Sequence, residues 1–434
     1  MDRSEIVRLD KAHVWHPYTA MDDYIARTDP FVIARAEGAQ LFDVDGKSYL
    51  DGNSSWWVAG LGHGHPRLLR VLGEQAARLS HCSLAGTTHE PAARLAAELC
   101  AIAPPGMTRA FFTDNGSTSV EVAVKMAVQM WRQLGQPGKS RFLALDGAYH
   151  GDTLGAASLG GVEVFRRPFA SVLFDCIRVP SPTEEGYASA FSAAERAITR
   201  EAGSIAAVVV EPVVQGAAGM RIYDPAYLRS LRELCTRMDV LLVVDEVFTG
   251  YGRTGPMWAC EHAGIAPDLM CLGKTFAPLF PMGATLATDR VFDAFRGSKD
   301  RALYYGHTFC GNPLGAAIAR EVLAIYREED ILGQIARKAP SIARTFERLE
   351  QAKGVARVRS LGMIGAADLT GAAGKEGGYL GDLGWRVYEE ARRRGAYLRP
   401  MGDTIYVCPP YTIAEAELDR LLGIVEDSVR AALG

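Results

Sequence analysis

Residues 240–255 read VLLVVDEVFTGYGRTG, five apolar residues followed directly by two carboxylates. An apolar run without polar alternation is typical of a parallel strand that helices cover on both faces. In an open parallel sheet, ligands collect beyond the carboxyl ends of the strands, where Asp245 and Glu246 fall. The segment therefore predicts a strand at 240–244 that presents Asp245 to a binding site.

A second buried run ends in a lysine. Residues 268–272, DLMCL, are followed by GKT at 273–275. A charge next to a buried strand loses hydration and needs a partner. We therefore expect one bound group to lie between Lys274 and Asp245. The alternative is that Asp245 caps the next turn and Lys274 begins an exposed loop. GKT does not end a nucleotide-binding loop, because that motif requires glycine where this chain has Asp268.

The order of the other segments predicts an α/β fold. Apolar runs alternate with helical patterns from about residue 110 to residue 289, as in a mostly parallel sheet. The strand candidates are 110–112, 141–145, 206–210, 240–244 and 268–272. The C-terminal region predicts a small α+β domain with a glycine-rich loop at 368–382, a helix at 385–394, strands at 396–400 and 404–410, and a last helix that starts with a Thr412–Glu415 capping box.

Composition excludes several classes of protein. The 434 residues, 48% of them hydrophobic, suffice for one large and one small domain. The net charge of −4 gives no support for nucleic acid or an anionic membrane as partner. The eight cysteines are scattered, which favours reduced thiols over a disulfide framework.

We also expect no metal site and no membrane segment. His63 and His65 lie in a turn sequence, GHGHP, without further residues at ligand spacing. The N-terminus has no apolar core, and no apolar run is long enough to span a bilayer. These features predict a cytoplasmic protein.

The segments VVDEVFTGYGRTG and DLMCLGKT resemble the signature of class III aminotransferases, pyridoxal-phosphate enzymes of fold type I. The resemblance implies a mostly parallel seven-stranded sheet in a large cofactor domain at 61–320, and a smaller α+β domain built from 1–60 and 321–434. It implies that Lys274 holds pyridoxal 5'-phosphate as a Schiff base and that Asp245 faces the pyridine nitrogen. A carboxylate there keeps the ring protonated, and a primary amine can both bind the aldehyde and move a proton.

A phosphate site is expected at the turn 113–118, which follows strand 110–112 and opens a helix. Free amides at a helix start form an anion site, and Gly116 and Ser117 fit one. The alternative is an ordinary helix cap. The resemblance assigns the phosphate to these two residues and makes Thr308 a contact donated by the partner subunit of a homodimer with shared active sites.

Three further residues fit the cofactor ring. Tyr149, in GAYHGDT after strand 141–145, matches the aromatic residue on which the ring stacks in the family, although a tyrosine there could instead pack a loop. Gln215, in VVEPVVQG, could reach the phenolic oxygen of the ring. Glu211 in the same stretch could form a structural pair with Arg253.

Substrate residues are expected in three distant segments. SSWW at 54–57, HVWHPYTAMDDY near the N-terminus and AYLRPMGDTIYVCPPY near the C-terminus resemble the class III aminotransferases of biotin synthesis. The resemblance places the following residues in the substrate site: Tyr18, Trp56, Trp57, Gly306, Arg399 and Tyr406. An arginine fork suits a terminal carboxylate, and aromatic rings cover methylenes at roughly 0.8 kcal/mol per buried CH₂. The alternative is that the tryptophans are core and Arg399 forms a surface ion pair.

The implied reaction is amino transfer to 8-amino-7-oxononanoate, giving 7,8-diaminononanoate, with S-adenosylmethionine as donor and Tyr406 near its adenosine part. His307 stands where many members that use this donor have proline, so lysine is an alternative donor. A general ω-amino acid:pyruvate aminotransferase is a second reading. A catalytically silent binding module of the same fold is a third, but such relatives commonly lose the lysine that this chain retains.

Overall fold

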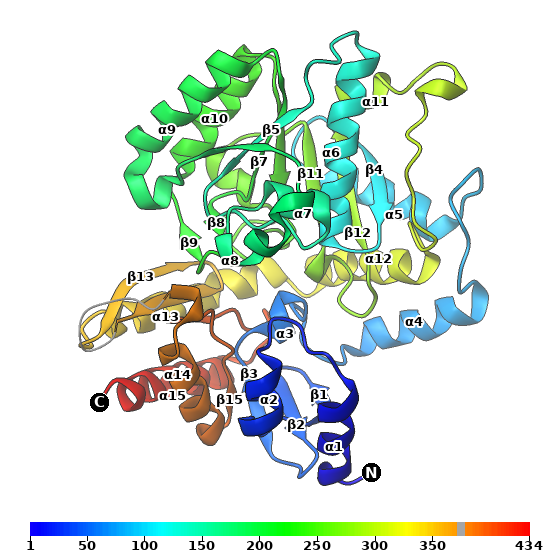
Figure 1. The fold of residues 1–434 in the computed structure, drawn as a ribbon. Helices are drawn as coiled ribbons and strands as arrows, with labels where there is room; N and C mark the ends of the chain where they lie inside the picture. Colours follow the sequence, from blue (N-terminus) through cyan, green and yellow to red (C-terminus); the bar gives the residue numbers. More distant parts are fainter. Residues whose placement is uncertain (371–377) are drawn as a thin grey trace.

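The computed structural model describes residues 1–370 and 378–434 (Figure 1). Residues 371–377 of the expected glycine-rich loop lie outside the described residues. Seven strands form the largest sheet in the order β4-β12-β11-β10-β7-β5-β6. Their bounds are β4 Met107–Thr113, β5 Arg141–Leu145, β6 Cys176–Val179, β7 Ile205–Val210, β10 Leu241–Asp245, β11 Leu269–Leu272 and β12 Gly283–Thr288.

The sheet is mostly parallel, as the sequence predicts. Strand β10 pairs in parallel with β7 and β11, and β5 pairs in parallel with β6 and β7. Strand β12 runs antiparallel to both β11 and β4. All five strand candidates are confirmed to within a few residues, whereas β6 and β12 were not among them. Strand β12 reads GATLAT, and its small residues give little strand signal.

Both faces of this sheet are buried. Val243 packs in one apolar cluster with residues of α6, and Leu242 and Val244 pack in another with residues of α10. Successive side chains of a strand point to opposite faces, so a strand covered on both sides needs apolar residues at every position. This explains why 240–244 shows no polar alternation.

Helices cover the sheet and connect its strands. The α-helices and 3₁₀-helices (η) of the large sheet region are α4 Pro66–Arg78, α5 Glu90–Ile102, α6 Gly116–Gln133, α7 Leu154–Leu159, α8 Glu163–Arg166, η1 Arg167–Val172, α9 Pro182–Glu201, α10 Pro225–Arg237, η2 Ala259–Ala263, η3 Lys274–Phe276, α11 Asp289–Asp293, η4 Lys299–Arg301 and α12 Pro313–Glu328. A short hairpin joins β8 Val214–Gln215 to β9 Arg221–Ile222. In Figure 1, α9 and α10 flank one side of the sheet and α6 crosses it.

The two ends of the chain pack together beneath the large sheet (Figure 1). Strand β3 pairs in parallel with β15, which unites N-terminal and C-terminal segments in one four-stranded sheet. The elements of this region are α1 Arg3–His13, α2 Met21–Arg27, β1 Ile33–Glu37, β2 Gln40–Asp43, β3 Ser48–Asp51, α3 Ser54–Trp57, α13 Ile331–Leu349, β13 Val355–Leu361, β14 Ile364–Leu369, η5 Gly378–Leu380, α14 Leu383–Arg394, β15 Ala396–Tyr397, β16 Thr404–Val407 and α15 Glu415–Leu433. The domain boundaries near residues 60 and 320 stay a prediction.

The last helix starts later than the sequence indicates. Helix α15 begins at Glu415, and Glu417 rather than Glu415 accepts a hydrogen bond at its start, from the amide of Ala414 at 3.3 Å. The expected Thr412–Glu415 capping box is therefore wrong. The amide of Ile413 instead donates to Pro410 in a turn before the helix, which delays its first residue.

Within the described residues, no helix combines the length and the apolar character that crossing a bilayer requires.

Candidate active site

A cavity of about 480 Å³ opens beyond the carboxyl ends of the parallel strands. Its lining residues follow strands β4, β5, β7, β10 and β11, and Trp57 adds a wall from the N-terminal region. These residues include Gly116, Ser117, Tyr149, His150, Asp152, Glu211, Asp245, Val247, Phe248 and Lys274. The structure therefore brings together the two charges expected from the sequence, at the edge of the sheet where ligands bind.

Lys274 projects into this cavity from the turn after β11. Its φ of 51° lies in the left-handed region, where a non-glycine residue is strained. Its ammonium lies 4.9 Å from the centre of the Trp57 ring and 5.9 Å from that of Phe248. Burial lowers the pKa of Lys274 to about 8, although the negative charges of Asp245 and Glu211 oppose this shift. A substantial fraction of this amine is neutral near physiological pH, so it can act as a nucleophile or a base.

Asp245 is fixed by two hydrogen bonds. One carboxylate oxygen accepts from the amide of Val247 at 3.0 Å, and the other lies 2.8 Å from Nδ1 of His150. Burial alone would lower the pKa of His150, but the hydrogen bond and charge of Asp245 outweigh it and raise that pKa. The other imidazole nitrogen, Nε2, is buried and has no partner among the described residues. His150 thus orients Asp245 and supports its negative charge.

Glu211 is a second buried carboxyl at the same edge. It accepts from the amides of Tyr149 at 3.0 Å and Gly216 at 2.9 Å. Burial raises the pKa of Glu211 to about 7, against the opposing effect of His150. The suggested pair with Arg253 is not formed, because Arg253 donates to the carbonyl of Pro409 at 3.0 Å and stacks over Tyr411.

The start of α6 forms an anion-binding cup at the cavity wall. Asn115 caps the helix by accepting from the amide of Thr118 at 3.0 Å. The amides of Gly116 and Ser117 have no hydrogen-bond acceptor within the described part of the chain. A side chain at Gly116 would collide with Val247, and one at Gly151 would collide with Ser117. Two unpaired amides and a hydroxyl at a helix N-terminus suit a phosphate.

A tyrosine pair lies at the mouth of the cavity. The hydroxyl of Tyr149 donates to Asp152 at 2.8 Å and lies 3.3 Å from that of Tyr18, which also donates to Asp152. Tyr18 comes from the N-terminal segment, and its ring meets Trp56 edge to face at 5.5 Å. Asp152 therefore links Tyr18, the expected substrate residue, to Tyr149, the expected ring-stacking residue.

The SSWW segment adopts a left-handed turn. Its φ values are 48° for Ser54, 44° for Ser55, 65° for Trp56 and 74° for Trp57. Each such residue costs roughly 1–2 kcal/mol relative to a right-handed conformation, so other contacts must hold the turn. The Ser54 hydroxyl donates to the carbonyl of Cys408 at 2.6 Å, and the Ser55 hydroxyl donates to Asp51 at 3.2 Å.

The left-handed turn sends the two tryptophans in different directions. Trp57 is 5% exposed, lines the cavity and donates from its indole nitrogen to the hydroxyl of Tyr406 at 3.1 Å. Trp56 is 40% exposed, and the guanidinium of Arg399 lies 4.8 Å from its ring. Tyr406 therefore orients the Trp57 ring through this hydrogen bond, whereas Trp56 and Arg399 form an outer surface near Tyr18.

Besides Tyr18, Trp56, Arg399 and Tyr406, three more expected site residues do not line this cavity. Gln215 is fully buried, and its amide donates to Asp146 at 3.0 Å and accepts from Ser181 at 2.6 Å, so it does not line the cavity. Gly306 and Thr308 lie on an exposed loop between η4 and α12 and do not line the cavity of their own chain.

Sequence reasoning missed His150 and Asp152. Both follow the expected Tyr149 within three residues, in the segment GAYHGDT after β5. Their position in the sequence could have indicated them, because polar residues just after the carboxyl ends of parallel strands lie at the same edge of the sheet. The partner that gives each its role is distant in sequence, at Asp245 for His150 and at Tyr18 for Asp152.

Comparison with known proteins agrees with this geometry. Residues 24–429 match the aminotransferase class-III family. The adenosylmethionine-8-amino-7-oxononanoate aminotransferase of Synechococcus elongatus is 44% identical over 96% of this chain and 98% of the relative, and that of Geobacter sulfurreducens is 41% identical over 98% and 97%.

Solved structures agree in the same way. The structure of the adenosylmethionine-8-amino-7-oxononanoate aminotransferase from Methanocaldococcus jannaschii has a TM-score of 0.95 and 32% identity, over 99% of both chains. The ω-transaminase from Pseudomonas jessenii in complex with PMP has a TM-score of 0.93 and 29% identity, over 98% of both chains. The match over almost the whole chain places this protein in the class III aminotransferase family.

Proposed function

We propose that this protein is a pyridoxal 5'-phosphate-dependent aminotransferase of biotin synthesis that converts 8-amino-7-oxononanoate to 7,8-diaminononanoate. The donor's amino group replaces the ketone oxygen of the acceptor, and the donor leaves as the corresponding carbonyl compound. The observation that carries the proposal is one cavity that combines Lys274, Asp245 and an anion cup with an aromatic wall and a nearby guanidinium. The relatives named for this reaction match the chain over nearly its full length.

The residues present fit the cofactor. The cavity of about 480 Å³ lies within the usual range for small-molecule sites. The unpaired amides of Gly116 and Ser117 suit the phosphate, and Tyr149 offers a flat face for the ring. The partnerless Nε2 of His150 indicates that this buried site is built to face another polar group.

The chemistry of the residues follows from their environments. The cofactor supplies an electron-withdrawing ring that stabilises negative charge at the reacting carbon of the bound amine. Asp245 would stabilise a proton on the ring nitrogen of a bound cofactor, and His150 keeps the carboxylate oriented for that role. Lys274 would hold the cofactor through its neutral amine, and the same amine would accept and return a proton at the reacting carbon.

The acceptor is recognised outside the cofactor cup. Trp57, Trp56 and Tyr18 cover its methylene chain, and each buried CH₂ contributes roughly 0.8 kcal/mol. Arg399 binds the terminal carboxylate. Within the described residues its guanidinium pairs with no carboxylate, stacks on Trp56 at 4.8 Å and on Trp385 at 5.8 Å, and hydrogen-bonds the hydroxyl of Tyr379. Because a guanidinium carries five N–H donors, those that do not contact Tyr379 are available to a substrate carboxylate.

The donor is S-adenosylmethionine, and the active unit is a cytoplasmic homodimer. Gly306 and Thr308 lie on an exposed loop, which supports a role in the partner subunit's site, with Thr308 at the phosphate. Tyr406 acts through Trp57, because its hydroxyl accepts the Trp57 indole proton. His307 next to Thr308 keeps lysine as the alternative donor.

Assays of the purified holoenzyme test acceptor and donor separately. With S-adenosylmethionine as donor, 8-amino-7-oxononanoate should give diaminononanoate, measured by mass spectrometry, and pyruvate should give little alanine. Turnover of pyruvate with ω-amines, without activity on 8-amino-7-oxononanoate, would contradict the proposed acceptor. Diaminononanoate formed from lysine but not from S-adenosylmethionine would contradict the donor alone.

A further inference from the structure

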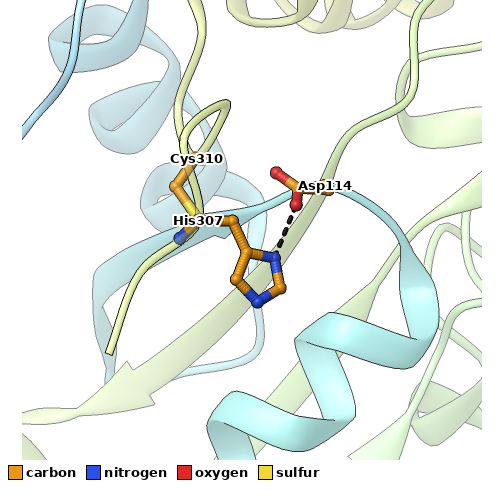
Figure 2. Close-up of side chains that lie close together, drawn as sticks. All are labelled: Asp114, His307 and Cys310. Carbon is orange, nitrogen blue, oxygen red and sulfur yellow. Dashed lines mark hydrogen bonds and ion pairs between the residues drawn. The ribbon is translucent and has the colours of Figure 1, made fainter. Parts of the chain in front are cut away.

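A group of metal-ligand side chains lies outside the cavity, next to the anion cup. Asp114 stands between β4 and α6, two residues before Gly116, whereas His307 and Cys310 lie on the loop before α12. One ligand atom from each of the three lies within 4.8 Å of the others. Figure 2 shows the imidazole of His307 directed at Asp114, with the Cys310 sulfur beside the backbone of His307.

We propose that Asp114, His307 and Cys310 form a zinc-binding site with a fourth position open to water. An oxygen, an imidazole nitrogen and a sulfur are a donor set that zinc accepts. The sulfur selects against magnesium and calcium, which prefer oxygen ligands. Three protein ligands and one open position are a common arrangement for this ion.

Two of the ligands are held by one tight turn. The amide of Cys310 donates to the carbonyl of His307 at 3.1 Å, and the amide of His307 donates to the Cys310 sulfur at 3.1 Å. The His-x-x-Cys spacing thus brings the imidazole and the thiol to the same side of the chain.

The outer partners of the site are also in place. Nε2 of His307 lies 2.9 Å from the hydroxyl of Tyr305, which leaves Nδ1 as the atom that faces Asp114. Such a partner on the second imidazole nitrogen fixes the orientation of a ligand histidine. The second oxygen of Asp114, Oδ1, is buried and has no hydrogen-bond partner among the described residues. A buried, unpaired oxygen of a half-buried carboxylate is a group that a cation would stabilise.

The ligand atoms must shift by about 1 Å to surround the ion, because their separations reach up to 4.8 Å. Zinc bonds of about 2.0–2.3 Å in a tetrahedron place ligand atoms roughly 3.3–3.7 Å apart. Nδ1 of His307 and Oδ2 of Asp114 are 2.5 Å apart, so these two atoms must separate by about 1 Å to admit the ion. The exposed His307 side chain can make that movement by rotation. The ion would then tie the loop that carries His307 to the start of α6.

Metal binding to the holoenzyme tests the site directly. Cobalt(II) serves as a spectroscopic substitute, because a thiolate–cobalt bond gives an intense near-ultraviolet band. We expect one cobalt per chain with that band, and one zinc per chain by elemental analysis after dialysis. Magnesium in excess should not displace either ion.

Variants separate the proposed site from binding elsewhere. Cys310→Ser should remove the cobalt–thiolate band, and both it and His307→Ala should weaken zinc binding by at least about tenfold. Tyr305→Phe should keep the band and weaken binding by about tenfold, since only the outer partner is lost. Cys100→Ser is the matched control, because Cys100 is also partly buried but lies on α5.

Two results would overturn the proposal. One is a holoenzyme that retains no zinc and shows no cobalt–thiolate band, which would leave the three residues as a hydrogen-bonded group only. The other is unchanged zinc stoichiometry and affinity in folded Cys310→Ser and His307→Ala proteins. Circular dichroism of each variant establishes that it is folded, and the cobalt band of Tyr305→Phe reports on the site without removal of any ligand.

Discussion

The two walls of the active-site cavity are built in different ways. On the cofactor wall, Glu211, Asp245 and Lys274 each lie at the end of a parallel strand or within two residues of it, so strand register brings them together. On the substrate wall, residues 54–57 adopt a left-handed turn that is held by contacts to the C-terminal segment, such as Ser54 to Cys408. The first wall is a property of the sheet, and the second depends on tertiary contacts between the chain ends.

Removing the central amine of the cofactor wall should have the largest effect. Lys274→Ala should reduce turnover to background, because no other lysine lines the cavity within the described residues. The fold should persist, since the side chain projects into the cavity and not into the packed core. Borohydride treatment followed by peptide mass spectrometry should find the pyridoxyl adduct on Lys274 in the native protein.

Lys299→Ala is a suitable control, because Lys299 lies in the exposed turn η4. Normal turnover of Lys274→Ala, or an adduct on a different lysine of the native protein, would mean that Lys274 does not hold the cofactor. The wall that contains Lys274 would then not be the cofactor wall.

Arg399, on the outer surface beside the substrate wall, should have a smaller and more selective effect. A charge-assisted hydrogen bond contributes about 1.5–3 kcal/mol, so Arg399→Ala should raise KM for the keto acid roughly 10- to 100-fold. The cofactor absorbance should not change. Arg393→Ala is the control, because Arg393 pairs with Glu390 on an exposed face of α14. If Arg399→Ala changes only thermal stability, Arg399 belongs to the scaffold of this wall.

The difference between the walls also explains what the sequence predicts. The five strand candidates locate Asp245 and Lys274 because a buried strand followed by a charge is a local pattern. The left-handed turn has no such pattern, since nothing within Ser54–Trp57 indicates positive φ values. Tyr18 and Arg399 were assigned from the family resemblance, and contacts to Asp152 and Trp56 bring them to the site.

Groups that act through distant partners could not be found from local patterns. The roles of His150 and Asp152 depend on hydrogen bonds to residues far along the chain. The same holds for Asp114, which is 193 residues from His307 in the sequence. The start of α15 was misplaced because a turn at Pro410–Ile413 overrides the Thr412–Glu415 pattern.

The lowered pKa of Lys274 gives a pH test of the cofactor wall. Only the neutral amine attacks an aldehyde, and its fraction rises with pH until the pKa is passed. With a pKa of about 8, loading of the apoenzyme with pyridoxal phosphate should accelerate about tenfold per pH unit below pH 8 and level off above it. An ordinary lysine would level off only above about pH 10.4.

The charge of Asp245 sharpens this test. Because that carboxylate raises the pKa of Lys274 against the effect of burial, Asp245→Asn should move the break in the pH profile downward. Stopped-flow absorbance measures both profiles. A break near pH 10 in the native protein would mean that Lys274 is solvated rather than buried in the cofactor wall.

The smallest expected effect tests the backbone of the substrate wall. Ser55 has φ 44° and ψ 59°, a conformation that glycine adopts without strain and alanine does not. Ser55→Gly and Ser55→Ala both lose the hydrogen bond to Asp51, so the difference between them isolates the backbone. The left-handed strain of about 1–2 kcal/mol exceeds the entropic advantage of alanine, about 0.4–1 kcal/mol, so the glycine variant should have the higher free energy of unfolding.

The same pair of substitutions at Ser192 provides the reference, because Ser192 is exposed in the regular helix α9. There alanine should be more stable than glycine by about 1 kcal/mol, the reverse of the order at Ser55. Chemical denaturation of the four holoenzyme variants measures both differences. The same order at both positions would mean that the turn is not left-handed in solution. The direction of Trp56 toward Arg399 would then depend on side-chain packing and not on the backbone of this turn.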